Sequence, residues 1–242
     1  MRLDRWLVSL GVGSRSQVQK LIRSGAVRVD GQIARDPAQS FSGAEPLALR
    51  GEPLDGRLSR HIMLHKPAGL LTAARDRKQP TVMDLLPPAL PTLGCMPVGR
   101  LDKDTTGLLL LTTDGELNHR LLAPGRHVDK TYRATVDGLL TGAEVDAFAA
   151  GLRLSDFNAR PATLEILSSD EAASTALVTV HEGKFHQIKR MFEAVGRQVT
   201  TLHRLTFGSL TLDESLAPGE WRELTEAELA ALYRDAQMKE PL

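Results

Sequence analysis

The stretch GRLDKDTTGLLLLTTDGEL, residues Gly99–Leu117, runs from a polar charged loop directly into four consecutive leucines and then into a turn. A short apolar run bounded by turn signals is typical of a buried strand, so polar groups at its mouth are held rigidly. Asp102 lies there beside Arg100, whose positive charge can keep a carboxylate ionised. A hydroxyl of Thr105 or Thr106 can orient that carboxylate. Such a group can act as a nucleophile or a base, although an Arg-x-Asp pair taken alone is also typical of an ordinary loop salt bridge.

Short strands and capped helices are expected on both sides of this stretch. The apolar segments that indicate strands are residues 61–64, 108–111, 132–136, 164–167, 177–180 and 210–212. The helices best signalled are residues 116–122 after Asp114, residues 143–150 after a Thr141–Glu144 capping box, and residues 185–195. Because strands outnumber helices without strict alternation, we predict an α+β fold with a mixed, mainly antiparallel β-sheet and flanking helices.

The helix expected at residues 185–195 has the clearest pattern. Its apolar face consists of Phe185, Ile188, Met191, Phe192 and Val195. Gly196 follows as a stop signal. Lys189 lies on the opposite, polar side of the same helix.

The amino-terminal segment predicts a small unit of two helices and a hairpin. Residues 3–10 indicate a short helix, and Ser14 with Gln17 three residues later is a capping box that begins a second one, which ends at Gly25. Asp30-Gly31 then predicts a tight turn between two short strands. A small apolar core can form from these elements, consisting of Leu7, Leu10, Val18, Leu21 and Ile22.

The charges are unevenly spread along the chain, although its net charge is zero. Residues 1–35 hold seven basic and two acidic side chains, which makes this segment +5. We expect its apolar residues to face inward and to leave four basic side chains in solvent, namely Arg5, Arg15, Lys20 and Arg23. If RNA binds, a local basic face therefore contacts the phosphates.

Length and composition limit the remaining possibilities. The 242 residues, 42% hydrophobic and 25% charged, suit a small and a medium-sized globular domain. No apolar run approaches the roughly 18 residues that cross a bilayer, and the amino terminus lacks an apolar signal segment, so we expect a cytoplasmic protein with no membrane partner. Cys95, the single cysteine, excludes an internal disulfide and a multi-cysteine zinc site.

A stretch without periodicity, GEPLDGRLS at residues 51–59, looks like a linker between domains. The expected division is residues 1–50 for an RNA-binding domain, residues 51–59 for the linker and residues 60–242 for a catalytic domain.

Several motifs in this order resemble those of RNA-modifying enzymes. LDRWL, SRSQVQKLI and VRVDG resemble the S4 RNA-binding domain. GRLDKDTTGLLLLT resembles the signature around the catalytic aspartate of the RsuA and RluA-like pseudouridine synthases, while KPAG at residues 66–69 and EGKFHQIKRMF at residues 182–192 resemble two further motifs of this family. KTY at residues 130–132 is similar to the segment with the family's active-site tyrosine. With the ending LAPGEWRELTEAEL, the resemblance spans nearly the entire chain.

The resemblance implies isomerisation of a uridine already in RNA, with no cofactor and no metal. Such an enzyme extrudes the nucleotide from its helix into a pocket. Asp102 takes the place of the nucleophile, which attacks either the sugar or the base. Tyr132 stacks on the uracil, and Lys189 lies next to the aspartate and keeps it ionised. Without the resemblance, a core tyrosine and a solvated helix face explain these two residues equally well.

Two further contacts with the substrate are implied. Arg100 approaches the RNA backbone or fills the gap left by the flipped base, because a guanidinium can both pair with phosphate and stack. Ile188 or Leu205 forms an apolar wall for the base, although core packing also explains both residues.

The RsuA branch of the family is favoured by the leader domain together with GRLD and HQIKRM. HRLLAPGRHVDKTY, residues 119–132, and the ending LAPGEWRELT are similar to the branch that modifies a single uridine in 16S rRNA. The implied partner is therefore ribosomal RNA, either free or in a small-subunit assembly intermediate, and we expect a monomer. Action on 23S rRNA is the alternative within the family.

Two interpretations from other classes compete with this one. Asp102-Lys103-Asp104 could bind a metal in a glycosyl or phosphoryl transferase, since hard cations take oxygen ligands. However, the sequence has no GxxxxGK phosphate loop, and His61 with His65 lacks the glutamate of a His-Glu-x-x-His zinc site. The second rival is a non-catalytic RNA-binding or ribosome-assembly protein, which would tolerate a change of Asp102 to asparagine.

Overall fold

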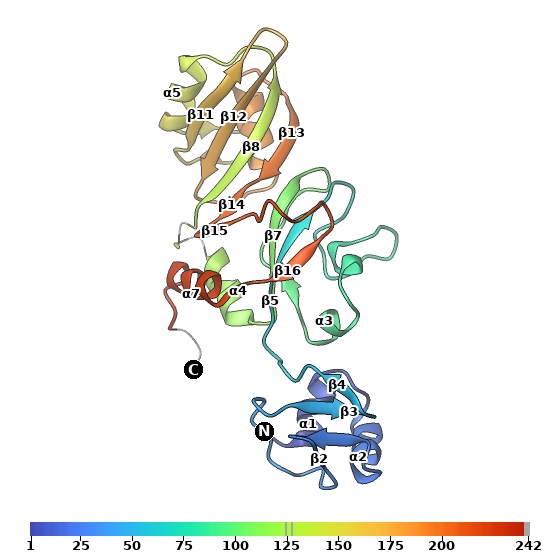
Figure 1. Ribbon diagram of the computed structural model, residues 1–242. Coiled ribbons are helices and arrows are strands. Elements are labelled where there is room, and N and C mark those ends of the chain that lie inside the picture. Colours follow the sequence, from blue (N-terminus) through green and yellow to red (C-terminus); the bar gives the residue numbers. More distant parts are fainter. Residues whose placement is uncertain (124, 127, 240–242) are drawn as a thin grey trace. The chain divides into compact units, whose positions relative to one another are not determined.

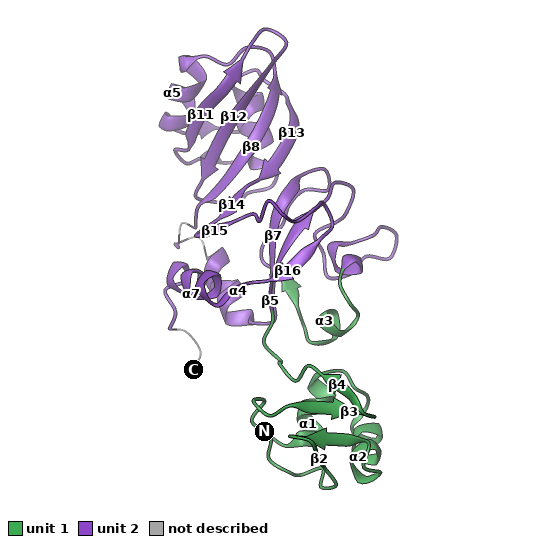
Figure 2. Ribbon diagram, viewed as in Figure 1, with its two compact units in different colours: residues 1–60, 86–96 green, residues 61–85, 97–242 purple. Residues whose placement is uncertain are grey.

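The computed structural model describes residues 1–123, 125–126 and 128–239. Two compact units account for these residues (Figure 2): unit 1 contains residues 1–60 and 86–96, and unit 2 contains residues 61–85 and 97 onward. Pro124 and His127, in the motif at residues 119–132, and residues 240–242 of the expected catalytic domain lie outside the described residues. None of the described helices is both long enough and apolar enough to cross a membrane.

Unit 1 is a pair of helices packed on a four-stranded sheet (Figure 1). Its elements are α1 (Leu3–Ser9), α2 (Arg15–Arg23), β1 (Val27–Val29), β2 (Gln32–Ile33), β3 (Leu47–Leu49), β4 (Glu52–Leu54) and α3 (Ala89–Thr92). The strands follow the order β2-β1-β3-β4, and each pair is antiparallel.

The local signals at the amino terminus are confirmed. Ser14 caps α2 and forms the predicted capping box with Gln17. Asp30 and Gly31 turn the β1–β2 hairpin with positive φ angles of 49° and 74°, which suit the right-handed twist of the strands. The buried cluster beneath the helices includes Leu7, Val18 and the other predicted core residues except Leu21, which is partly buried.

The segment expected to be a linker, residues 51–59, is in part an element of unit 1. Glu52–Leu54 forms β4 and pairs with β3. Farther along, the Trp6 indole donates a hydrogen bond of 2.6 Å to the Gly56 carbonyl, and its ring packs edge-on against Phe41. The absence of periodicity was misleading here because a three-residue edge strand is too short to show alternation.

Unit 2 is built on one large sheet. Its helices are η1 (Val82–Leu85), α4 (Gly115–Leu122), α5 (Gly142–Ala150), α6 (Gln187–Ala194) and α7 (Glu226–Asp235). The sheet has the order β11-β12-β8-β13-β7-β5-β16, and neighbours along it are antiparallel except β13 and β7, which are parallel. Its strands are β5 (His61–Lys66), β7 (Thr106–Thr112), β8 (Lys130–Asp137), β11 (Thr163–Ser169), β12 (Ala173–Val180), β13 (Val199–Arg204) and β16 (Trp221–Glu223).

Shorter strands complete the chain. They are β6 (Met96–Pro97), β9 (Leu152–Arg153), β10 (Asn158–Ala159), β14 (Thr206–Phe207) and β15 (Leu210–Thr211). The prediction of an α+β fold with a mixed, mainly antiparallel sheet and flanking helices is confirmed.

Different helices cover the two halves of this sheet (Figure 1). On the β7–β5 half, α4 and α7 pack Leu121 and Leu232 into the same buried cluster as Leu108 of β7. The Tyr233 hydroxyl of α7 donates a 2.8 Å hydrogen bond to Asp114, the N-cap of α4. On the other half, α5 lies against β11 and α6 against β13, and Phe148 meets Phe192 with 4.9 Å between ring centroids.

One helix begins later than predicted. We expected residues 185–195, but α6 starts at Gln187 because His186 has a left-handed backbone with φ of 50°. Phe185 therefore lies outside the helix, 68% exposed, and its ring stacks on that of His186. The placement of Phe185 on the apolar face was wrong, whereas Ile188, Met191 and Phe192 are buried as expected.

Candidate active site

Asp102 lies in the loop that leads into β7, beside a cavity of about 110 Å³. Its side chain is 25% exposed. Arg100, Tyr132 and Ile188 line the same cavity, although they come from three separate parts of the sequence. The structure therefore brings together the predicted nucleophile and three residues that were expected to contact the RNA substrate.

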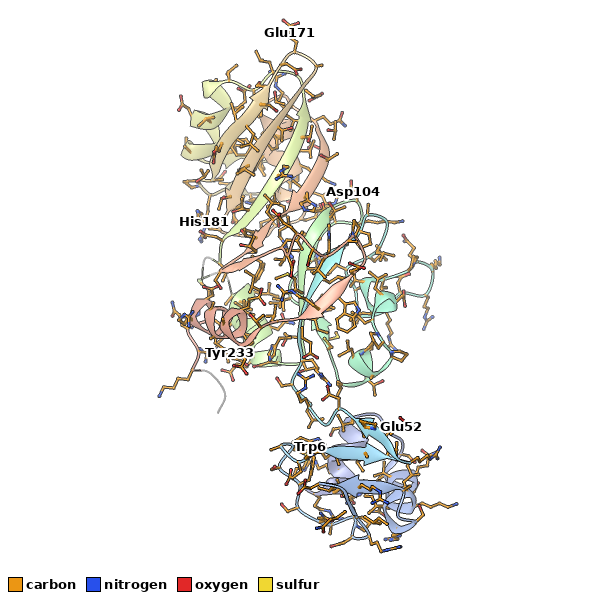
Figure 3. The ribbon with its side chains drawn as sticks, viewed as in Figure 1. Trp6, Glu52, Asp104, Glu171, His181 and Tyr233 are labelled. Atoms are coloured by element: carbon orange, nitrogen blue, oxygen red, sulfur yellow. The ribbon has the colours of Figure 1, made fainter. Side chains whose placement is uncertain are left out.

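Two basic side chains face the Asp102 carboxylate. The Lys189 ammonium lies 3.8 Å from Asp102 Oδ2, and His186 Nε2 lies 3.6 Å from Asp102 Oδ1. Lys189 makes its shorter contacts with Asp104, at 2.7 and 2.8 Å, and this hydrogen bonding holds the pKa of Asp104 below its usual value. The ammonium thus lies between the two carboxylates that the rival interpretation assigned to a metal. Figure 3 shows Asp104 near the start of β7.

Lys66, at the end of β5, binds the backbone of the Asp102 loop. Its side chain is 0% exposed, and its Nζ donates to the carbonyls of Pro67, Lys103 and Thr105 at 3.0, 3.2 and 2.9 Å. The loop therefore has its carbonyls turned toward a fixed cation, which leaves little freedom to the backbone on both sides of Asp104. Burial lowers the pKa of Lys66 to about 8.

The segment after Lys66 adds neutral contacts to the same loop. The Thr72 hydroxyl donates to the Leu101 carbonyl at 2.8 Å, and the Leu101 amide donates back to that hydroxyl at 3.2 Å. The Gly69 amide donates to the Lys103 carbonyl at 2.8 Å. KPAG and the residues after it therefore position the loop that bears Asp102.

Some expected contacts are not formed. The Thr106 hydroxyl bonds His203 Nδ1 at 2.8 Å, and the buried Thr105 hydroxyl has no hydrogen-bond partner among the described residues, so neither orients the Asp102 carboxylate. The apolar wall of the cavity includes Ile188 and Leu202, whereas Leu205 is not among its lining residues.

Two buried cations that the sequence analysis overlooked also line the cavity. They are Lys130 at the start of β8 and Arg204 at the end of β13. Lys130 shares the inward face of β8 with Tyr132, and a charged residue at an inward position of an alternating strand could have identified it. Arg204 gave no such local signal.

A wider groove of about 750 Å³ adjoins the cavity at Asp102. Its basic lining side chains include Lys103, Arg160 and Lys184, and His181 lies at its edge after β12 (Figure 3). Among the described residues, no group of three or more histidine, cysteine or acidic side chains is arranged to hold a metal ion.

The predicted RNA contacts of unit 1 are on its surface. Arg5, Arg15, Lys20 and Arg23 are all exposed. Arg15 lies 3.6 Å from the buried carboxylate of Asp4.

Comparisons with known proteins show the family of this chain. The model of the RNA pseudouridylate synthase family matches residues 60–194, and that of the S4 domain matches residues 1–43. This chain belongs to the RNA pseudouridine synthase family. In this pseudouridine synthase the S4 match lies in unit 1, and most of the synthase match lies in unit 2.

Relatives of this pseudouridine synthase match along nearly the full chain. "Uncharacterized RNA pseudouridine synthase YtzG" of Bacillus subtilis is 42% identical over 96% of this chain and 98% of its own. "Ribosomal small subunit pseudouridine synthase A" of Pseudomonas aeruginosa and of Escherichia coli are 42% and 39% identical, over 96% of this chain and 100% of theirs. A crystal structure of a pseudouridylate synthase, 36% identical, superposes with a TM-score of 0.67 over 96% of this chain and 99% of its own.

Proposed function

We propose that this pseudouridine synthase converts one uridine of 16S small-subunit ribosomal RNA to pseudouridine, with Asp102 as the nucleophile. The observation that carries the proposal is the cavity in which Asp102, Arg100, Tyr132 and Ile188 meet. The choice of RNA is supported by the relatives named as ribosomal small subunit pseudouridine synthases, at 39–42% identity over 96% of this chain.

The proposed roles follow from the contacts. The uridine flips into the cavity, Tyr132 stacks on its ring, and Ile188 forms the apolar wall. Lys189, whose ammonium lies 3.8 Å from Asp102 Oδ2, places a positive charge beside the nucleophile. Arg100, exposed at the rim, contacts the RNA backbone or occupies the place of the flipped base.

The S4 domain is proposed to hold the RNA by its phosphates. Arg5, Arg15, Lys20 and Arg23 of the proposed RNA-binding domain, residues 1–50, are exposed and can release counterions from the RNA. We propose that the enzyme acts as a monomer in the cytoplasm, on ribosomal RNA that is free or in a small-subunit assembly intermediate.

Pseudouridine mapping of 16S and 23S rRNA tests the proposal. Cells with the wild-type protein, without it, and with Asp102→Asn are compared by chemical labelling and primer extension. We expect one 16S site to disappear in both mutant strains, because an amide is a poor nucleophile and turnover falls below detection.

Three controls distinguish a change of target RNA, loss of the nucleophile and a loss of folding. Purified Asp102→Asn must retain the wild-type melting temperature, since its side chain is partly exposed. Loss of a 23S site instead would show that the enzyme acts on the RNA of the large subunit. Full modification in the Asp102→Asn strain would refute the role of Asp102.

A further inference from the structure

Lys130 and Arg204, which we call the cation pair, are buried beside the same aromatic ring. They are 8% and 1% exposed. The Lys130 ammonium and the Arg204 guanidinium each lie 5.3 Å from the centroid of the Phe207 ring. Both side chains and Phe207 line the cavity that contains Asp102.

The cation pair is only partly satisfied by the protein. Lys130 donates to the Val128 carbonyl at 2.6 Å, and Arg204 Nε donates to the Leu108 carbonyl at 2.7 Å. Arg204 Nη2 is buried and has no hydrogen-bond partner among the described residues. The charge of Asp129 acts favourably on Lys130, but more weakly than burial and the charge of Arg204 oppose it. Burying two cations side by side with so few direct partners opposes folding.

The pKa of Lys130 also shows that burial disfavours its charge. Burial, and then the charge of Arg204, lower the pKa of Lys130 to about 8. The other ionisable groups that line the cavity are Arg100, Asp102, Tyr132, Glu182, Lys184 and His186. Glu182 accepts hydrogen bonds from the side chain of Gln187 and the backbone amide of Arg160, so its charge is already engaged. An anion in the cavity would offset the two buried positive charges of the cation pair.

Both routes open to Asp102 place negative charge on the uracil. If the carboxylate attacks C1′, an O–C1′ bond forms, the N1–C1′ bond breaks, and its electron pair remains on the ring, delocalised over N1, O2 and O4. If the carboxylate adds to C6 instead, an O–C6 bond forms and the electrons of the C5–C6 double bond move toward O4. The N1–C1′ bond then breaks and leaves its electron pair on N1. Donors that are fixed in advance and aimed at developing charge contribute strongly in a site that excludes water.

We propose that the cation pair is an anion-binding subsite that stabilises the negative charge on the uracil ring during its detachment and rotation. This role rests on the proposed function and assigns two further catalytic residues to it. After rotation, C5 bonds to C1′, the bond to Asp102 breaks and returns its electron pair to the carboxylate. C5 then loses its proton to a base, and N1 gains a proton. The role proposed for the cation pair is electrostatic and includes neither of these proton transfers.

Lys130→Met tests the proposal because it removes a charge while nearly preserving shape. We measure tritium release from 16S rRNA transcripts containing 5-tritiated uridine, with enzyme in excess, together with RNA affinity and melting temperature. The rate constant should fall about 10²–10³-fold, the range found when one such donor is removed. RNA affinity should stay within about two-fold, and the melting temperature should not fall, since an uncompensated buried charge has been removed.

Two variants serve as controls. Lys130→Arg keeps the charge and should recover much of the rate, and Lys78→Met makes the same change at an exposed lysine outside the cavity and should resemble the wild type. If Lys130→Met retains the wild-type rate constant, or loses rate only in proportion to stability, the proposal is wrong.

A measurement of ligand binding, without turnover, distinguishes failure of the anion-binding subsite from failure of the proposed reaction on 16S rRNA. Barbiturate has the shape of uracil but is anionic at neutral pH, and we titrate it and neutral uracil into each variant by calorimetry. The wild type should prefer barbiturate, and Lys130→Met should lose that preference. Equal binding of the two rings by the wild type would overturn the subsite, whereas a preference without any tritium release would refute the proposed reaction on 16S rRNA and leave the subsite standing.

Discussion

Two lysines of unit 2 are buried at the cavity loop and the cavity wall, and their surroundings differ. Lys66 donates to three backbone carbonyls, whereas Lys130 donates to one and lies near a second cation. Burial lowers the pKa of both to about 8. A buried ammonium with its donors satisfied contributes to structure, while one without partners is available to a ligand.

Lys66→Met should therefore behave oppositely to Lys130→Met in stability. It removes the ammonium that donates to the carbonyls of Pro67 and Thr105, which costs about 1–3 kcal/mol of unfolding free energy, while the Lys103 carbonyl keeps the Gly69 amide as a donor. Activity should fall as well, because the Asp102 loop loses its anchor. Urea denaturation and tritium release measure the two effects, and unchanged stability would show that other contacts suffice to hold the loop.

At the scale of elements, the only parallel contact along the main sheet order of the described residues joins β13 to β7 through two residue pairs, His203 with Thr106 and Arg204 with Gly107. This short ladder is possible because Gly107 has φ of 103° and no side chain. A Cβ atom there would lie 2.2 Å from the Arg204 carbonyl oxygen and 2.6 Å from its nitrogen. Gly107 thus permits the close approach of Arg204, which lines the cavity, to β7.

Gly107→Ala should destabilise unit 2 by at least about 2 kcal/mol, since it combines backbone strain with a clash against main chain. Gly115→Ala is the matched control, because nothing lies within 4 Å of its added Cβ and the residue begins α4. That change should be neutral or slightly stabilising. Equal urea midpoints for the two variants would contradict this account of the β13–β7 contact.

The features predictable from sequence are those with local causes. The capping boxes at Ser14 and Thr141 require only residues three positions apart, and both occur in the structure. Phe185 was misplaced because helical spacing does not report the left-handed conformation of His186. Arg204 could not be found, since its role depends on the pairing of β13 with β7 and β8, two strands that are distant from β13 in sequence.

For the molecule as a whole, the net charge is zero, but unit 1 is basic. If unit 1 contacts RNA phosphates, the affinity for RNA should depend on the salt concentration. Replacing Arg5, Lys20 and Arg23 together with glutamine should lower the slope of log affinity against log salt by about 0.7 for each lost contact to single-stranded phosphate. Filter binding to 16S rRNA at several salt concentrations measures it.

A variant with the same loss of charge in unit 2 is the control. Arg133, Arg153 and Arg234 are exposed, and none of them lines the cavity or the groove. Their replacement by glutamine should leave the slope near that of the wild type. An equal decrease in both variants would mean that total charge, and not the S4 domain, sets the affinity.

The position of β13 also dictates when the enzyme becomes active during its own synthesis. Asp102 and Tyr132 leave the ribosome early, but the cavity wall lacks Arg204 and Phe207 until those residues emerge and β13 inserts between β7 and β8. Long-range pairing of this kind forms late. A nascent chain can therefore have a folded S4 domain before it has a complete cavity, so that RNA contact precedes the capacity to modify RNA.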